Sequence, residues 1–325
     1  MYPLAEAVAS EAAASEAEQD KKEKAMSERK NYLFCYFTGN EPERESINYA
    51  LSRDGYHFTP VNNNRPFLFN TKGTRGVRDP FLFRAEDGSF YIIGTDMRSD
   101  NGWASNHAMC VWHSDDLVNF EQYELIDMND YGLYGSVRTW APEVLYDKEK
   151  ELYMIYWANC QHIKETDEWT KTVMWYAYTK DFRTLETEPQ ILYAPPCNKD
   201  AIDGDIIEKD GIFYLYYKDE NEKHICYVYS DCPEGPYKEP QKKNITVFSE
   251  HTEGCCMYKE YGTDNYLMIM DSYVKGGYLM QKTTDMVNFE AVSESDYDFD
   301  FSPRHGSMLA ITDEEYDRIV KFFEE

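Results

Sequence analysis

The sequence predicts an all-β fold, a five-bladed β-propeller, because strand-like segments and their turns recur along the chain in the same order. Aromatic residues make up 16% of the 325 residues, and such residues favour pleated, half-buried strands. A turn phrase, Ser/Thr-x-Asp-x-x-x-Phe/Leu, begins at Ser52, Ser114, Thr179 and Thr283, with a distorted fifth copy at Ser230. The Asp of the phrase is suited to capping a turn between two outer strands. The spacing between successive copies of the phrase is typical of propeller blades.

Each repeat also contains an inner strand that opens with a recurrent tripeptide and continues into apolar residues. The tripeptides are Asp79-Pro80-Phe81, Ala141-Pro142-Glu143, Asp203-Gly204-Asp205, Glu253-Gly254-Cys255 and His305-Gly306-Ser307. The inner strands of a propeller surround its central channel. We therefore expect Asp79, Asp203, Glu253 and His305 at one mouth of the channel, with Glu143 and Asp205 one step deeper on the same strand faces.

The two ends of the chain complement each other. The last inner strand, HGSMLAIT, has no second strand after it, and the first strands, beginning with YLFCYFTG, have no inner strand before them. We expect the two to pair in one of five four-stranded blades, so that residues 31–325 form a single propeller domain. Residues 1–30, rich in Ala, Glu and Lys, are expected to be a mobile or loosely helical extension without a secretory signal, which predicts a cytoplasmic protein, or a periplasmic or secreted one if a leader has been lost.

Composition excludes several classes of partner. The net charge of −27 disfavours nucleic acid and anionic membranes, which need a basic face, and no apolar run reaches the length of a membrane helix. The eight cysteines form no C-x-x-C pair, so we expect reduced thiols rather than zinc ligands or a disulfide framework. Neutral or cationic ligands remain open.

The three carboxylates predicted at the channel mouth indicate a glycosidase. Carboxylates that face one cavity repel each other, which raises the proton affinity of at least one. Glycosidic cleavage needs one protonated acid and one ionised carboxylate, and a third can orient and tune the acid. Strand-opening caps would account for one or two of these acids. The alternative of another class is a non-catalytic carbohydrate-binding propeller or interaction scaffold.

These motifs together resemble glycoside hydrolase family 43, five-bladed enzymes of arabinan, xylan and galactan side-chain breakdown. The resemblance covers about Tyr32 to Ile311 and rests on five segments: GVRDPFLF, WAPEVLY, AIDGDIIEKDGIFYL, TEGCCMYKEYG and PRHGSMLAIT. It implies hydrolysis by single displacement with inversion, with Asp79 as general base, Asp203 as the carboxylate that orients and tunes the acid, and Glu253 as general acid. Base and acid would lie roughly 6.5–9.5 Å apart.

The chain departs from the family pattern at two motifs. The family commonly has Asp-Pro at the tuning position, whereas this chain has Asp203-Gly204-Asp205, so Asp205 is a rival for that role. Glu253 is followed by Gly-Cys rather than Gly-Pro, and a Glu-Gly-Pro occurs instead at Glu234. Because Glu234 falls in the outer-turn phrase of its blade, we interpret it as a decoy.

Further residues are candidates for substrate or ion binding. Trp140 and Glu143 resemble the sugar-contacting segment of the family, with ordinary wall packing as the other interpretation of Trp140. Other candidates lie near the mouth: Asp96, Trp103, Arg78 and Arg304. His305 resembles a channel histidine that in some members helps to hold a calcium ion, mostly through water, although a satisfied core histidine is an equal alternative. No cofactor is expected to be required, and a structural calcium ion in the channel is a further expectation.

The leading hypothesis is an exo-acting, inverting α-L-arabinofuranosidase that acts on plant cell-wall polysaccharide side chains or oligosaccharides. β-D-xylosidase and exo-β-1,3-galactosidase activities are close alternatives, because loop shape chooses the sugar. The oligomeric state is left open by the sequence. Related fructan-hydrolysing enzymes, which retain configuration, require an Asn-Asp-Pro motif ahead of Arg-Asp-Pro, and none precedes Asp79. That reading is therefore disfavoured.

Overall fold

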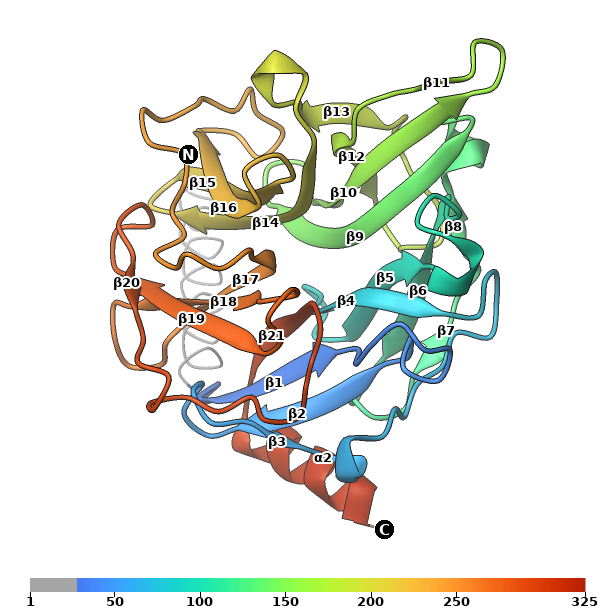
Figure 1. Cartoon of the computed structure of the whole chain (residues 1–325). Helices are drawn as coiled ribbons and strands as arrows, with labels where there is room; N and C mark the ends of the chain where they lie inside the picture. The colour runs from blue at the N-terminus through green and yellow to red at the C-terminus, as the bar shows by residue number, and fades with distance from the viewer. Residues whose placement is uncertain (1–27, 325) are drawn as a thin grey trace, which may run out of the picture.

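The computed structural model describes residues 28–324, which form five β-sheets around a central axis (Figure 1). The described part of the chain is thus a five-bladed β-propeller, as the sequence repeats predicted. The prediction of an extension over residues 1–30 falls almost wholly outside the described residues. Within residues 28–324 no helix is long and apolar enough to cross a membrane.

One blade combines strands from both ends of the described chain. Its inner strand β21 (Gly306–Ile311) pairs antiparallel with β1 (Asn31–Tyr36), with Tyr36 opposite Gly306. The sheet continues through β2 (Asn48–Ser52) to β3 (Thr59–Pro60).

The other blades follow in chain order, and each is antiparallel with its inner strand first. The β4 blade contains β4 (Val77–Arg84), β5 (Phe90–Asp96), β6 (Ala108–Ser114), β7 (Glu121–Gln122) and β8 (Ile126–Asp127). The β9 blade contains β9 (Ser136–Asp147), β10 (Leu152–Ile163), β11 (Glu168–Trp169), β12 (Val173–Thr179) and β13 (Gln190–Tyr193). The β14 blade contains β14 (Ala201–Lys209), β15 (Ile212–Asp219) and β16 (His224–Ser230). The β17 blade contains β17 (Glu253–Lys259), β18 (Tyr266–Asp271), β19 (Tyr278–Thr283) and β20 (Glu290–Ala291).

Three blades differ from the predicted four-stranded pattern, because the sheets of the β4 and β9 blades have five strands and that of the β14 blade has three. In the described β14 blade the outer strand is missing. Isolated bridges from Tyr229 to Lys238 and from Cys226 to Asn244 stand where an outer strand would lie. Three prolines interrupt this segment: Pro233, Pro236 and Pro240. Proline has no backbone N–H to donate to a ladder, so the segment makes bridges rather than a continuous strand.

The repeated turn phrase has the structure that the sequence predicted. Asp54 Oδ1 accepts hydrogen bonds from two backbone amides, at positions 56 and 57, and Asp116 and Asp285 accept in the same way from amides two and three residues on. These caps end the third strand of three blades. Hydrophobic cores between the blades include the fully buried Trp112 and Trp157.

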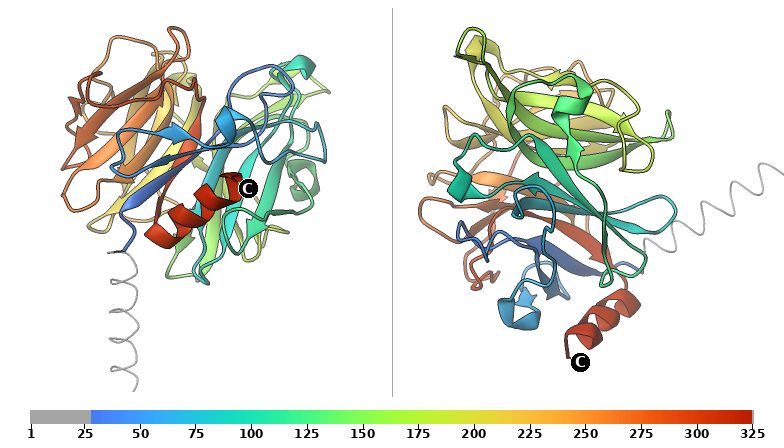
Figure 2. Two further views of the ribbon diagram at one scale, coloured as in Figure 1. Left: turned by 90° about the horizontal axis from the view of Figure 1, so that it is seen from below. Right: turned by 90° about the vertical axis from the view of Figure 1, so that its right-hand side faces the viewer.

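The remaining regular elements are short or peripheral. The 3-10 helices are η1 (Asn62–Asn64), η2 (Ser99–Asn101), η3 (Met128–Tyr131) and η4 (Pro196–Asn198). The helix α2 (Asp313–Glu324) follows β21 and lies along one rim of the propeller (Figure 2). Its buried Ile319 packs into the core between the blades of β1 and β4, and Glu315 pairs with Arg84 of β4. All eight cysteines are free thiols.

Candidate active site

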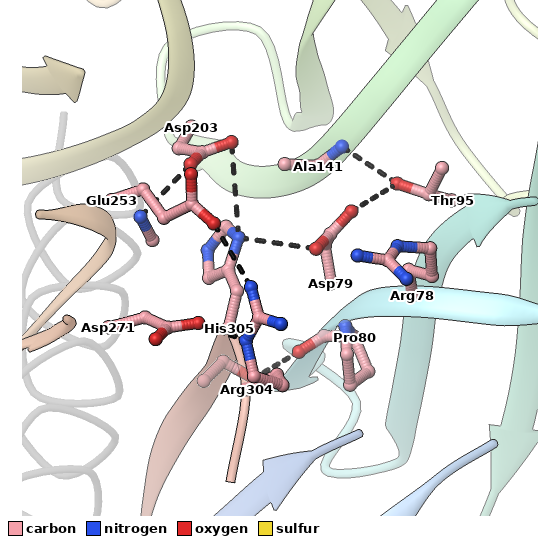
Figure 3. Close-up of polar contacts among 12 residues, drawn as sticks. Arg78, Asp79, Pro80, Thr95, Ala141, Asp203, Glu253, Asp271, Arg304 and His305 are labelled. Carbon is pink, nitrogen blue, oxygen red and sulfur yellow. Dashed lines mark hydrogen bonds and ion pairs between the residues drawn. The ribbon is translucent and has the colours of Figure 1, made fainter. Parts of the chain in front are cut away.

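The candidate site is a small cavity where the inner strands begin. It has a volume of about 80 Å³ and is lined by Arg78, Asp79, Met97, Trp103, Trp140, Ile202, Asp203 and Glu253. The three carboxylates predicted from the sequence therefore share one cavity, together with three of the predicted binding residues. Figure 3 shows Glu253 and Asp203 on one side of His305 and Asp79 on the other.

Four inner strands carry a β-bulge at this level, each with a residue in the left-handed region. The residues are Asp79, Ala141, Asp203 and Gly254, with φ between 45° and 55°, and the ladders of β4, β9, β14 and β17 shift register there. For the three that are not glycine this conformation costs on the order of 1 kcal/mol each. Bulges next to active sites re-aim side chains, so repeated strain at one level is consistent with a functional mouth.

The bulges correct the predicted register in one blade. Glu253 pairs with Asp271 ahead of the bulge, as Arg78 pairs with Thr95, so Glu253 is equivalent to Arg78 and not to Asp79. The position of Asp79 is taken in β17 by Gly254. A Cβ at Gly254 would lie 2.6 Å from His305 Cγ, so the bulge there requires glycine. The sequence alignment matched acid with acid and missed this steric requirement.

Asp79 is held as an ionised carboxylate. Thr95 donates a hydrogen bond of 2.9 Å to Asp79 Oδ2, and His305 Nδ1 lies 3.5 Å from Oδ1. Burial raises the pKa of Asp79, but the imidazolium of His305, the Arg78 guanidinium and the Thr95 hydroxyl outweigh burial and hold the pKa below its usual value. Thr95 Oγ1 also accepts from the Ala141 amide, which fixes its orientation.

His305 lies between two aspartates. Its Nδ1 is 3.5 Å from Asp79 Oδ1 and 4.0 Å from Asp203 Oδ1. Burial lowers the pKa of His305, but the carboxylates of Asp203 and Asp79 outweigh burial and raise the pKa to about 9. An imidazolium has no free lone pair and repels a second cation. Calcium prefers oxygen ligands, and His305 Nδ1 already faces Asp79 and Asp203, so the residues do not fit a calcium ion bound directly at His305. A calcium ion held through water stays a prediction.

Asp203 links the mouth to the strand that carries Glu253. Its Oδ2 accepts a hydrogen bond of 2.9 Å from the Gly254 amide. Burial raises the pKa of Asp203 to about 6, the carboxylates of Glu253 and Asp79 act in the same direction, and the imidazolium of His305 opposes them. Asp203 can thus exist in either protonation state near neutral pH.

Glu253 is flanked by two cations. Lys218 Nζ donates to Glu253 Oε2 at 2.7 Å, and Arg304 Nη2 donates to Oε1 at 3.2 Å. Asp271 accepts from Arg304 Nε and holds its guanidinium in place. Asp271 is almost completely buried, and burial raises its pKa to about 6 against the opposing effect of Arg304.

Lys218 was not predicted from the sequence. It lies near the end of β15, opposite Ile202, and its ammonium group also contacts Glu220 at 2.9 Å and the face of Tyr273 at 4.2 Å. The side chain is 3% exposed. Lys218 is a charged residue in a Tyr-rich second strand. Alignment of the second strands of the blades, in addition to the inner strands, could have identified it as a candidate residue at the mouth.

Arg78 is present in the cavity and is held in place through its Nη1. Its Nη1 donates to Asn40 Oδ1 at 2.9 Å and to the buried Glu45 at 3.1 Å. The guanidinium carbon lies 5.1 Å from the ring centroid of Trp103, which is 52% exposed. Arg78 therefore fixes the wall beside Asp79 and supports Trp103 at the rim.

Two predicted substrate-binding residues have a different environment. Asp96 does not line the cavity, because its buried carboxylate accepts hydrogen bonds from Asn70 and Thr74 and anchors their loop. Glu143 lies deeper in the channel, as its position two residues beyond Ala141 implied. Its carboxyl accepts from Tyr156 at 2.8 Å, and burial, with a smaller effect of Asp205, raises its pKa well above the usual value.

The two other acids considered from the sequence also lie outside the cavity. Asp205 is buried below Asp203 and accepts a hydrogen bond from the Met257 amide at 2.6 Å. Burial raises the pKa of Asp205 to about 7, although the Met257 amide opposes this. Glu234 is in an outer turn, where it is bound by Lys150 and Cys232. Both environments are accounted for by local structure.

Solved structures share this fold. A candidate exo-β-1,3-galactanase from Bifidobacterium bifidum has a TM-score of 0.60 at 12% identity, over 83% of this chain and 90% of that one. The catalytic domain of a family 62 α-L-arabinofuranosidase from Coprinopsis cinerea has a TM-score of 0.52 at 15% identity, over 70% and 72% of the two chains. BlXynB, a family 43 protein from Bacillus licheniformis, has a TM-score of 0.57 at 13% identity, over 81% and 52%.

Fold and site together define the class, a glycosidase built on a five-bladed β-propeller. The sequence model of the glycoside hydrolase 43-related family, described as "Probable glycosyl hydrolase domain", matches residues 27–317, and the chain belongs to this family. An α-L-arabinofuranosidase from Bifidobacterium longum is 26% identical over 205 residues. That match covers 56% of this chain and 18% of the relative, so the chain corresponds to a small part of that longer protein.

Proposed function

We propose that the protein is an inverting, exo-acting α-L-arabinofuranosidase in which Asp79, Asp203 and Glu253 carry the chemistry. The observation that carries this proposal is that the three carboxylates line one small cavity at the channel mouth. Two carboxyl groups in opposite protonation states are what hydrolysis by inversion requires. The small volume argues against passage of a polysaccharide chain through the cavity.

In this mechanism Asp79 is the general base. Its lowered pKa keeps it ionised at neutral pH, so it can accept a proton from the attacking water as the water adds to the anomeric carbon. Thr95 and His305 hold its two oxygens in fixed positions. A base that is already oriented loses little entropy when the reaction begins.

Glu253 is the general acid that protonates the leaving oxygen. Without substrate its carboxylate is bound by Lys218 and Arg304. In this mechanism Glu253 reacts in its protonated form, with the proton taken from solvent, and its O–H donates to the glycosidic oxygen in place of accepting from the Lys218 ammonium. After transfer of the proton to the leaving group, both cations again stabilise the carboxylate. This favours the transition state over the ground state.

Asp203 is the positioning carboxylate. Its hydrogen bond to the Gly254 amide fixes the backbone directly after Glu253, and its charge disfavours a second negative charge nearby. The position of Asp203 in the cavity wall, with Asp205 outside it, supports Asp203 rather than Asp205 in this role.

A substrate panel tests the proposal. Purified protein is assayed with p-nitrophenyl α-L-arabinofuranoside, β-D-xyloside and β-D-galactoside and with arabino-oligosaccharides, and the anomer formed first is followed by proton NMR. We expect free arabinose of inverted configuration. If the protein prefers the xyloside or the galactoside, the proposed substrate changes from arabinose to that sugar and the proposed mechanism stays. Galactose is included because a candidate galactanase shares the fold. Binding of these glycans without turnover would favour a non-catalytic propeller.

A further inference from the structure

The β9 blade is longer at the mouth than its neighbours. Trp140, at the cavity wall, pairs with Ala158 of β10, and β10 continues for residues 159–163 beyond that pair. The equivalent pairs in the other blades are Arg78 with Thr95, Ile202 with Lys218 and Glu253 with Asp271. The second strand ends one residue after this pair in the β4 and β14 blades, and it ends at the pair in the β17 blade. Five extra residues extend a strand by about 16 Å. Among the described blades, this one therefore has a strand ladder that projects past the cavity.

One face of this extension continues from the cavity wall. Residues 158, 160 and 162 of β10 point to the same face because strand side chains alternate. Their ladder partners are Trp140, Arg138 and Trp169. These three side chains therefore form a row that leads outward from the cavity.

The outer end of this row is an exposed aromatic surface. Trp169 is 52% exposed and stacks on His162 with ring centroids 4.9 Å apart and an interplanar angle of 24°. Tyr134 is 74% exposed, and its backbone carbonyl accepts a hydrogen bond from the Gln161 side chain, while the carbonyl of the next residue, Gly135, accepts from the His162 amide. We call Tyr134, His162 and Trp169 the aromatic shelf.

The shelf is preorganised without a partner in the described chain. His162 Nε2 lies 2.8 Å from Asp167 Oδ1, which fixes the ring beneath Trp169. Between the shelf and the cavity, Arg138 donates to Thr172 at 3.0 Å and its guanidinium lies 5.0 Å from the Trp140 ring centroid. Trp169 and His162 are thus held as a rigid, exposed aromatic stack, a surface on which flat apolar faces can bind.

We propose that the aromatic shelf binds the uncharged polysaccharide chain whose side-chain residue enters the cavity. This inference rests on the proposed function, because it extends the same substrate outward from the cavity. Tyr and Trp rings bind the flat apolar faces of sugars while their polar edges stay hydrated. The hairpin carries three acidic residues, Glu165, Asp167 and Glu168, against two basic ones, Lys164 and Lys171, and the whole chain carries a net charge of −27. An anionic polysaccharide would be repelled, so a neutral chain is the occupant that fits.

Affinity electrophoresis in gels that contain arabinoxylan, linear arabinan or polygalacturonate tests the proposal. Trp169→Ala and Tyr134→Ala are compared with the wild type and with Phe322→Ala, a matched control on α2 with an aromatic ring that is 42% exposed. We expect the wild type and the control to be retained by at least one neutral polymer and not by polygalacturonate. Each shelf variant should bind that polymer at least about fivefold more weakly.

The same variants are assayed for turnover. We expect KM to rise on the neutral polymer and to stay unchanged on the preferred p-nitrophenyl glycoside, which is too short to reach the shelf. Wild-type retention that persists in Trp169→Ala, or no retention by any neutral polymer, would overturn the proposal. So would a wild-type dimer that becomes a monomer in Trp169→Ala by sedimentation, because the shelf would then bind a second copy. Retention lost with the shelf but no turnover by the wild type would support the shelf and refute the glycosidase mechanism.

Discussion

The Gly254 amide donates a hydrogen bond of 2.9 Å to Asp203 Oδ2, so the backbone beside Glu253 is attached to the neighbouring carboxylate. The two strands β14 and β17 belong to different blades. This contact therefore sets the position of one candidate catalytic residue relative to another across a blade interface. It also depends on the left-handed conformation of Gly254, with φ of 55°.

Substitution of Gly254 tests that dependence. In Gly254→Ala the new Cβ would lie 2.6 Å from His305 Cγ, and we expect a loss of about 2–3 kcal/mol in the free energy of unfolding. The matched control is Gly262→Ala in the same blade, with φ of 75° and no atom within 4 Å of the new Cβ. The control should lose about 1 kcal/mol. Equal losses in urea denaturation would show that contact with His305 does not matter.

The charge on His305 predicts how stability varies with pH. Its pKa is about 9 in the folded protein and about 6.5 when unfolded. A raised pKa gives stability that is complete below about pH 6.5 and is lost as pH rises through 9. Between pH 7 and 9 the loss from this residue is about 2 kcal/mol.

Urea denaturation of the wild type and of His305→Gln at pH 7 and pH 9 checks this. In that window Asp203, with a pKa of about 6, is largely ionised, but Asp205, with a pKa of about 7, is only about half ionised at pH 7 and also loses its proton. The difference between the wild type and the variant, rather than the wild-type slope alone, therefore reports on His305. The variant should be less stable at pH 7 and should lose less stability on going to pH 9. A variant with the same pH dependence as the wild type would mean that His305 is neutral.

The buried Asp205 is predicted to act as a hydrogen-bond acceptor. Asp205→Asn keeps an oxygen for the Met257 amide, whereas Asp205→Ala leaves that amide without a partner, at a cost of about 1–3 kcal/mol. Hydrogen exchange at Met257 should therefore be as slow in the Asn variant as in the wild type and faster in the Ala variant. Loss of turnover in the Asn variant with normal folding would instead identify Asp205 as the tuning acid.

Much of the fold could be predicted from the sequence because it is repetitive. The Asp-containing turn phrase marks the outer strands, and the turns at Asp54, Asp116 and Asp285 have the hydrogen bonds that the phrase implies. The shared mouth of Asp79 and Asp203 followed from the same periodicity. Repetition makes local patterns reliable, since each copy must satisfy the same packing.

The features that were missed depend on contacts between different repeats. The one-residue offset of Glu253 arises from the packing of His305 against Gly254, which a pattern within one strand cannot reveal. Lys218 lies on a second strand and meets Glu253 across a blade interface. Asp96 was predicted near the mouth, but the Asn70 and Thr74 loop that it anchors has no signal in the strand pattern.

The separate roles of Glu253 and Asp79 are tested most directly by the dependence of turnover on the leaving group. The preferred sugar is presented as a 2,4-dinitrophenyl glycoside, whose leaving group needs no proton, and as a natural oligosaccharide, whose leaving group does. We expect Glu253→Gln to lose about 10³-fold in kcat/KM on the oligosaccharide and to retain most of its activity on the aryl glycoside. Asp79→Asn should lose activity on both substrates, because both need an activated water. Equal losses on both substrates in Glu253→Gln, or retained turnover in Asp79→Asn, would contradict the account.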